Sequence, residues 1–247
     1  MSYDPAIQVA WRKRQEDLQH SHVLTDKHDD WSIDRSGGGL LAKGLQRVAG
    51  VDISFVKDSD EDALAMLAVL SYPELEVLHE VSAMVKLTAP YIPGYLAFRE
   101  APHLLALLEK LRAEQPSLVP QVIFVDGNGL LHPASFGLAC HLGVLGDIPT
   151  IGIGKTMMDV DGLLEPWKKR RLEPGSHELL VGTSGRVWGA AVTSSSSRVP
   201  TFVSVGHRVS LDTAIVLTEL VTRVRIPEPV RAADLSSRNL LRSRGLL

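Results

Sequence analysis

The sequence predicts an α/β fold in which a mixed central β-sheet carries helices on both faces. Two observations support this fold class. Three apolar or alternating segments follow one another in the first half of the chain, and a strand, a helix and a second strand with short links come after them. The first pattern is typical of a meander and the second of a right-handed parallel crossover. A sheet that contains both is mixed, and chemistry is expected at its strand ends.

The N-terminal segment precedes this core. Residues 5–20 have the pattern of a polar amphipathic helix, residues 28–35 form a charged connector, and the glycines at 37–39 form a hinge. We therefore divide the chain into an N-terminal helix and connector, residues 1–36, and one larger domain, residues 37–247. The helix could pack on the core or mediate contacts with other molecules.

The core begins with three predicted strands. They span residues 48–55, 63–70 and 75–87, and polar turns at 58–60 and 71–73 separate them. Strands of this length with short links predict a three-strand meander.

A helix and a crossover unit follow the meander. Because proline suits the first turn of a helix, the helix is predicted to begin at Pro102, and it ends before Pro116. Residues 122–125 have the pattern of a strand buried on both faces, and a helix at 134–145 leads to a short strand at 150–153. The remaining predicted elements are three apolar segments and two helices, at residues 179–181, 187–192, 202–205, 211–223 and 230–242.

Composition limits the possible classes of protein. With 45% apolar and 22% charged residues the composition is that of a soluble protein, and the longest apolar run, residues 63–70, has the length of a strand. Charged residues interrupt the N-terminus where a secretory signal needs an apolar segment, and the single cysteine, Cys140, excludes an internal disulfide. We therefore expect a protein of the cytoplasm, with the nucleus and nucleolus as further compartments, and with neither a membrane nor an obligate protein partner.

The distribution of charge is uneven. A net charge of −3 gives no overall attraction to nucleic acid, so binding of this kind needs a local basic surface. Basic residues gather at 168–171 and in the C-terminal quarter of the chain. They could form such a surface, or only a solvated helix face and a basic tail.

Four carboxylates stand where their surroundings do not favour them. Asp52 interrupts an apolar strand, where a buried carboxylate needs a cation or a hydrogen-bond donor. Asp126 ends a buried strand, Glu100 directly precedes the predicted helix, and Asp234 falls on the apolar stripe of the last helix, beyond its first turn. Asp126 could instead start a turn, and Glu100 could complement a helix N-terminus.

Together these carboxylates indicate a metal site. Acidic groups that converge in a site of low dielectric repel one another unless a multivalent cation lies between them. One cysteine and scattered histidines make no compact ligand set for zinc, whereas oxygen ligands suit Mg²⁺ or Mn²⁺. Such ions act on phosphodiesters by activating water and by stabilising charge on the leaving oxygen.

Several segments of the sequence resemble the endonuclease V family. One reads Pro-Tyr-Ile-Pro-Gly-Tyr-Leu-Ala-Phe-Arg-Glu from Pro90 to Glu100, and another reads Val-Asp-Gly-Asn-Gly from Val125 to Gly129. Further matches occur in the same order as in the family, at residues 51–54, 132–133, 140–143, 149–155, 206–208 and 225–231. The resemblance therefore extends from about Arg47 to Asp234.

The resemblance implies a ribonuclease H-like fold for the larger domain and a catalytic role for the carboxylates. Asp52 and Asp126 would hold Mg²⁺, for which Mn²⁺ can substitute, and Glu100 and Asp234 would complete the acidic site. Similar proteins cleave the second phosphodiester on the 3′ side of inosine and leave 3′-hydroxyl and 5′-phosphate ends.

Two further residues gain roles from the same resemblance. Lys155 would orient the attacking water or neutralise developing phosphate charge. His132 would lie near the scissile phosphate.

The resemblance also implies a rigid loop that contacts the substrate. Pro90 and Pro93 fix the backbone, so that Tyr91 and Ile92 can project and fill the gap left when a base rotates out of the stack. Glycines let backbone groups approach hypoxanthine closely enough to read its O6 acceptor and N1 donor. The other residues implied to contact substrate are Gly94, Gly127, Gly129 and Leu138. The segment could also be only a proline-rich turn with a buried tyrosine.

Two positions depart from the pattern of many family members: the first affects a phosphate or structural contact, and the second decides which substrate is expected. Ala134 stands where many family members carry arginine, and Asp234 stands where many bacterial members carry histidine, which resembles the animal branch. That branch is associated with inosine in RNA, so we expect inosine-containing single-stranded RNA to be preferred and deoxyinosine-containing DNA also to be cleaved. The alternatives are a catalytically weak module that binds inosine-containing RNA, a repair endonuclease that acts mainly on deoxyinosine in DNA, and a generic ribonuclease H-fold nuclease for hybrids.

Overall fold

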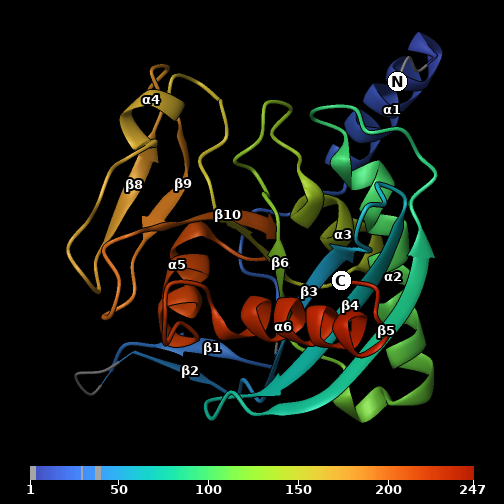
Figure 1. Ribbon diagram of the computed structural model, residues 1–247. Coiled ribbons are helices and arrows are strands. Elements are labelled where there is room, and N and C mark those ends of the chain that lie inside the picture. Colours follow the sequence, from blue (N-terminus) through green and yellow to red (C-terminus); the bar gives the residue numbers. More distant parts are fainter. Residues whose placement is uncertain (1–3, 29, 37–39) are drawn as a thin grey trace.

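The computed structural model describes residues 4–28, 30–36 and 40–247. Within these residues one eight-stranded sheet crosses the molecule in the order β5-β4-β3-β6-β7-β10-β9-β8 (Figure 1). The pairs β3–β6 and β6–β7 are parallel, and the other neighbours are antiparallel. The strands are β3 (Arg47–Phe55), β4 (Asp62–Ser71), β5 (Val77–Lys86), β6 (Val122–Asp126), β7 (Thr150–Gly154), β8 (His177–Val181), β9 (Val187–Val192) and β10 (Thr201–His207).

Helices cover both faces of this sheet (Figure 1). Val51 of β3 packs on one face, in an apolar cluster with the leucines of α2 and α3. Val48 packs on the other face, in a cluster with residues of α5 and α6. Because the side chains of a strand alternate between faces, the middle of the sheet is buried from both sides, as the sequence predicted. The helices are α2 (Leu96–Glu114), α3 (Leu138–Gly146), α5 (Leu211–Leu220) and α6 (Glu228–Ser243).

The predicted meander is confirmed, since β3, β4 and β5 pair antiparallel in chain order. Gly50 in β3 lies against the start of α6, where an added Cβ atom would be 1.8 Å from the carbonyl oxygen of Pro229. The two backbones therefore approach more closely than any side chain at this position would allow. This approach holds α6 directly over the strand that carries Asp52.

Two helices begin at residues other than those predicted. α2 begins at Leu96, so Pro102 lies inside the helix and Glu100 lies in its second turn rather than before it. The buried face of α2 continues upstream through two alanines, which are too small to give a clear hydrophobic signal. α3 begins at Leu138 rather than at residue 134, because the chain is still extended at Gly137.

The N-terminal helix α1 (Pro5–Gln19) packs on the core. The side-chain amides of Gln15 and Gln19 donate hydrogen bonds to backbone carbonyls of the loop before α3, those of Phe136 (2.7 Å) and Ala134 (2.7 Å) respectively. The sequence left open whether this helix contacts the core, and these bonds answer that question.

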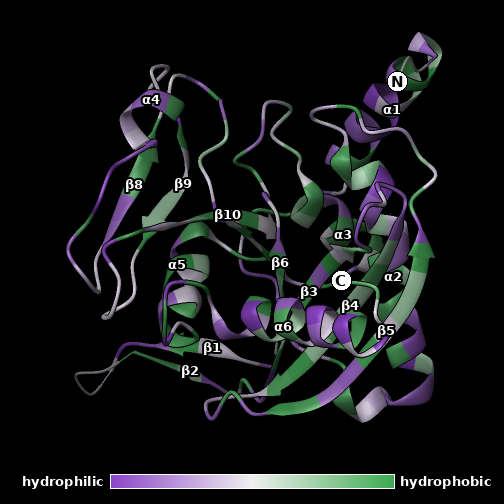
Figure 2. Ribbon diagram, in the orientation of Figure 1, coloured by the Kyte–Doolittle hydropathy of each residue, from purple (hydrophilic) through white to green (hydrophobic). Residues whose placement is uncertain are grey.

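The remaining elements are short. β1 (Ser32–Asp34) and β2 (Leu41–Lys43) form a separate two-stranded sheet, and η1 (Pro116–Leu118) and α4 (Leu164–Trp167) are single turns. The predicted glycine hinge at 37–39, and with it the boundary between the two predicted segments, lies outside the described residues. In Figure 2, α6 alternates between hydrophilic and hydrophobic stretches, as expected for a helix with one face on the sheet. No described helix has the length and hydropathy that a membrane crossing needs.

Candidate active site

Asp52 and Asp126 lie side by side on two parallel strands, Asp52 within β3 and Asp126 at the end of β6. Val51 of β3 pairs with Val125 of β6, so the next residue on each strand is one of the two aspartates. Residues that pair across a sheet point to the same face, and here this is the face covered by α6. Asp52 is only 8% exposed. The sequence predicted a carboxylate within one strand and another at the end of a buried strand, and the structure brings the two together.

Glu100 and Asp234 approach this pair from the two helical layers. Glu100 comes from α2 on one side of the sheet, and Asp234 comes from α6 on the other. Burial raises the pKa of Glu100 to about 8, and the charges of Asp52 and Asp126 raise it as well. All four carboxylates therefore share one electrostatic environment.

Asp52 shows the same repulsion. Its pKa is raised to about 6, first by burial, then by the charge of Asp126 and to a smaller extent by that of Asp234. Two hydroxyls oppose this rise, because Ser54 and Ser237 donate hydrogen bonds to Asp52 Oδ2 over 2.9 and 3.0 Å. Ionised carboxylates are thus disfavoured in this site unless positive charge enters it.

Two cations of the protein supply part of that charge. The Lys155 ammonium lies 2.5 Å from Asp126 Oδ2, and the Arg238 guanidinium lies 2.8 Å from Asp234 Oδ1. Burial lowers the pKa of Lys155, but its hydrogen bond to Asp126 and the surrounding carboxylates outweigh burial and leave the pKa raised. Lys155 is therefore protonated at neutral pH.

Three of the carboxylates are turned toward donors of the protein. Asp126 faces Lys155, Asp234 faces Arg238, and Asp52 faces two serine hydroxyls. In the described part of the chain, no group of three or more His, Cys, Asp or Glu side chains is arranged to hold a metal ion. The composition of the site nevertheless fits a hard divalent cation, because its ligands are carboxylate oxygens whose repulsion such a cation would relieve.

A small cavity lies directly beside Asp126. It has a volume of about 140 Å³ and is mostly apolar, and we call it the loop pocket. Five predicted site residues line it, namely Tyr91, Gly94, Gly127, His132 and Leu138. Gly127 leaves room for Leu138, whose side chain would be 3.2 Å from an added Cβ atom. Strand β6 thus joins the carboxylates to this pocket through consecutive residues.

The four other residues predicted to bind substrate lie outside the pocket lining. Ile92 is only 2% exposed, so the prediction that it projects with Tyr91 is wrong. The Tyr95 amide donates to the Ile92 carbonyl over 2.9 Å, and this turn directs the isoleucine inward, where burial of its side chain is favourable. Tyr91 does project, with 65% of its surface exposed. The other three are Pro90, Pro93 and Gly129.

His132 lies in the wall of the loop pocket and is only 6% exposed. Burial lowers its pKa to about 4, against a smaller opposing effect of a hydrogen bond to the backbone of Gly94. The imidazole is therefore neutral at physiological pH. Its Nδ1 atom accepts a hydrogen bond from the Ala134 amide over 3.2 Å. Both hydrogen bonds are to loop backbone, so the neutral ring fixes the pocket wall and adds no positive charge to it.

Sequence reasoning missed the residues that support these groups. Ser54 follows Asp52 by two positions, which places both on the same face of β3, and Ser237 follows Asp234 by three, which places both on the same side of α6. Those spacings were a usable signal. Asn128 and Phe136 of the loop pocket gave no comparable signal, because their positions depend on how the loops before α3 fold.

Comparison with known proteins agrees with the site. The model of the endonuclease V family matches residues 37–235. Endonuclease V of Homo sapiens is 50% identical over 238 residues, which cover 94% of this chain and 82% of the human protein. The chain belongs to the endonuclease V family. Membership confirms the resemblance read from the sequence and makes the chain an endonuclease.

Solved structures of the endonuclease V family have the same fold. The catalytic domain of human endonuclease V superposes with a TM-score of 0.90 at 44% identity, covering 99% of this chain and 100% of that one. A variant of Ciona intestinalis endonuclease V gives a TM-score of 0.83 at 31% identity, covering 98% of this chain and 99% of that one. That structure is a complex with a 23mer DNA containing an inosine followed by a ribo-adenosine. The predicted ribonuclease H-like fold is confirmed.

Proposed function

We propose that this endonuclease depends on a divalent cation and cleaves the second phosphodiester on the 3′ side of inosine, leaving 3′-hydroxyl and 5′-phosphate ends. Its preferred substrate is inosine-containing single-stranded RNA, as arises from editing, and deoxyinosine-containing DNA is a second substrate. The observation that carries the proposal is the adjacency of the buried carboxylates to the loop pocket along β6. The inosine in the DNA bound by the Ciona relative supports the choice of base.

Asp52 and Asp126 would hold Mg²⁺, or Mn²⁺ in its place, and Glu100 and Asp234 would complete the acidic site. The bound ion activates water and stabilises the leaving oxygen. Lys155, which pairs with Asp126, would be placed to direct its ammonium to the phosphate once Asp126 held the cation. Arg238 remains beside Asp234 and limits the negative charge of the site.

The loop pocket receives the hypoxanthine base in this proposal. Tyr91 is exposed and stands at the pocket rim, so its ring can stack against the base that neighbours the displaced one. Leu138 gives the pocket an apolar wall. His132 braces the pocket wall, and the backbone at Gly94 and Gly127 can approach the O6 and N1 edge of the base.

A basic hollow next to Lys155 provides the affinity for the phosphate backbone. Its volume is about 440 Å³, and its wall includes Lys155, which pairs with Asp126. Its cationic residues are Lys155, Lys168, Arg170, Arg171 and Arg225. This local surface is what a chain of net charge −3 needs in order to bind a polyanion.

Two other functions are separable from this one. A repair endonuclease acting mainly on deoxyinosine is supported by the DNA strand in the Ciona complex. A module that binds inosine-containing RNA without turnover is supported by the way in which Lys155 and Arg238 occupy the carboxylates.

One experiment distinguishes these functions. Purified protein with Mg²⁺ is given labelled RNA with one inosine, the same RNA with adenosine, and the matched deoxyinosine DNA. We expect one cut, one nucleotide beyond the inosine, with RNA cut faster than DNA and the adenosine strand intact. Asp52→Ala should abolish cutting and retain binding in Ca²⁺. Faster cutting of DNA would identify the repair enzyme, and binding without cutting in Mg²⁺ or Mn²⁺ would identify the module.

A further inference from the structure

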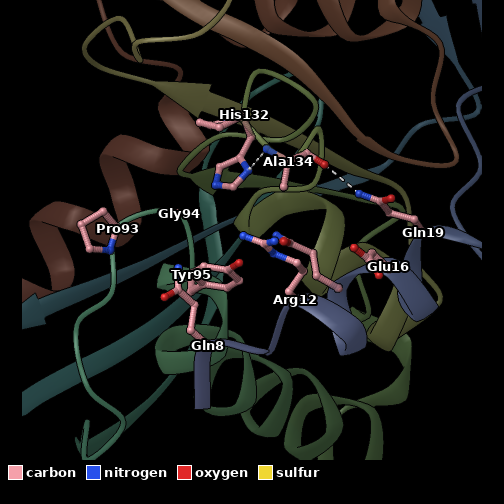
Figure 3. Close-up of a pocket in the computed structure, with 11 residues that line it drawn as sticks. Gln8, Arg12, Glu16, Gln19, Pro93, Gly94, Tyr95, His132 and Ala134 are labelled. Atoms are coloured by element: carbon pink, nitrogen blue, oxygen red, sulfur yellow. Dashed lines mark hydrogen bonds between the residues drawn. The ribbon is translucent and has the colours of Figure 1, made fainter. Parts of the chain in front are cut away.

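A larger cavity lies between α1 and the loop before α3, next to the loop pocket (Figure 3). Its volume is about 600 Å³, and we call it the α1 groove. Polar side chains of α1 form one wall, and Tyr95, His132 and Ala134 belong to the other. Figure 3 shows Arg12 and Glu16 reaching from α1 into the space below His132 and Ala134.

The α1 groove is built by specific contacts. Gln15 and Gln19 tie α1 to the loop before α3, as described above. Trp11 stacks on Phe98 of α2 with 4.9 Å between ring centroids. α1 is therefore held both by α2 and by the loop before α3. Arg12 is held near the Tyr95 hydroxyl, and this contact raises the pKa of the guanidinium. The groove thus contains a cation, Arg12, with the carboxylate of Glu16 near it.

The α1 groove is continuous with the loop pocket. Gly94 and His132 line both cavities. Gly127 and Asn128, which follow Asp126, line the loop pocket but not the α1 groove. The order across the surface is therefore carboxylates, loop pocket, α1 groove. A strand that places its base in the loop pocket and its scissile bond at the carboxylates leaves the pocket at the groove.

We propose that the α1 groove binds the nucleotide on the 5′ side of the inosine, with the Arg12 guanidinium on its phosphate. The inference rests on the proposed function, because cleavage on the 3′ side assigns the 3′ part of the strand to the carboxylates and leaves the 5′ part for the groove. Tyr95 is only 8% exposed, so its part in the subsite is to hold the Arg12 guanidinium through its hydroxyl. Glu16 opposes the phosphate and keeps this subsite weak.

Binding to two RNAs tests the subsite. One RNA begins with inosine at its 5′ end, the other carries four additional nucleotides before the inosine, and both have the same 3′ part. Dissociation constants are measured by fluorescence anisotropy in Ca²⁺ for the wild type, Arg12→Ala and Lys13→Ala. Lys13 is the matched control, since it is an exposed cation on the same helix that does not line the groove.

Arg12→Ala should weaken binding of the extended RNA about fivefold to tenfold, as expected for one charge-assisted hydrogen bond in partial contact with solvent. The same variant should bind the RNA with 5′-terminal inosine like the wild type. The slope of log affinity against log salt should fall by about 0.7 for the extended RNA only, because one phosphate contact is lost. Lys13→Ala should change neither RNA, and Glu16→Gln should tighten binding of the extended RNA alone.

Other outcomes overturn the assignment. An equal loss with both RNAs would mean that Arg12 acts through the fold, and thermal melting of the variant would register it. No loss with either RNA, together with no gain in Glu16→Gln, would remove the subsite. Failure of the proposed function has a different signature, because the wild type would then bind inosine and adenosine RNAs equally.

Discussion

The carboxylate site and the loop pocket are adjacent, yet the chain builds them in different ways. Asp52 and Asp126 sit on parallel strands whose register places them side by side. The loop pocket draws on the Pro-Tyr-Ile-Pro turn, the start of α2, the loop before α3 and the segment after β7. The groups assigned to chemistry are thus held by the sheet and repel one another, whereas those assigned to recognition are held by loop packing and are nearly uncharged. Substitutions in the carboxylate site should therefore affect cleavage, and substitutions in the loop pocket should affect binding.

The largest effect is expected at the carboxylate pair. Asp52→Asn and Asp126→Asn should each slow single-turnover cleavage in Mg²⁺ by roughly 10³-fold or more, since a metal supplies several kcal/mol of transition-state stabilisation. Affinity for inosine RNA in Ca²⁺ should stay close to that of the wild type, because the loop pocket is unchanged. Asp212→Asn, at an exposed carboxylate of α5 that pairs with Arg35, is the control. If both variants cleaved within about tenfold of the wild-type rate, the two aspartates would have a structural role and not a catalytic one.

A smaller effect is expected at the projecting tyrosine. Tyr91→Ala should weaken binding of inosine RNA about tenfold, the typical cost of a lost stacking contact, and should reduce the preference over adenosine RNA. Its melting temperature should not change. Ile92→Ala should do the reverse, losing about 2–5 kcal/mol of folding free energy because the side chain is buried. If both variants lost affinity and neither lost stability, the inward orientation of Ile92 would be contradicted.

The hydroxyl that supports Asp52 should give an effect that depends on pH. Ser237→Ala removes a hydrogen bond that favours the ionised carboxylate, so the pKa of Asp52 should rise further above its normal value. Cleavage should slow by up to about tenfold near pH 6, the size of one hydrogen bond, and recover at higher pH. Ser237→Thr keeps the hydroxyl and should restore the profile. A uniform loss at every pH would indicate a packing defect instead.

The smallest effect concerns stability without metal. Glu100 binds its proton more tightly in the folded chain, with a pKa of about 8 against an ordinary value of 4.5. Its contribution to stability is complete below the unfolded pKa and is lost as pH rises through 8. Glu100→Gln cannot ionise, so in EDTA at pH 8 it should melt about 2–4 °C above the wild type, with a smaller difference at pH 5. Adding Mg²⁺ should reduce the difference in melting temperature between the two proteins at pH 8. If the melting temperatures of the wild type and of Glu100→Gln differed by the same amount at pH 5 and pH 8, Glu100 would not be buried among like charges.

The local sequence determined much of this protein. Apolar runs and alternation placed the strands, including the meander and the two parallel strands, and the positions of Asp52 within a strand and Asp126 at a strand end marked the acidic site. These features depend on each residue and its near neighbours in the chain, so a pattern of period two or 3.6 is enough to find them.

Only the tertiary structure decided how these pieces meet. The approach of α6 at Gly50 and the docking of α1 over His132 each join residues far apart in the chain, and the burial of Ile92 depends on what packs around its turn. The raised pKa values of Asp52 and Glu100 have the same origin, since desolvation and repulsion depend on what surrounds a group in space. Long-range packing sets these quantities, and no local pattern of residues records it.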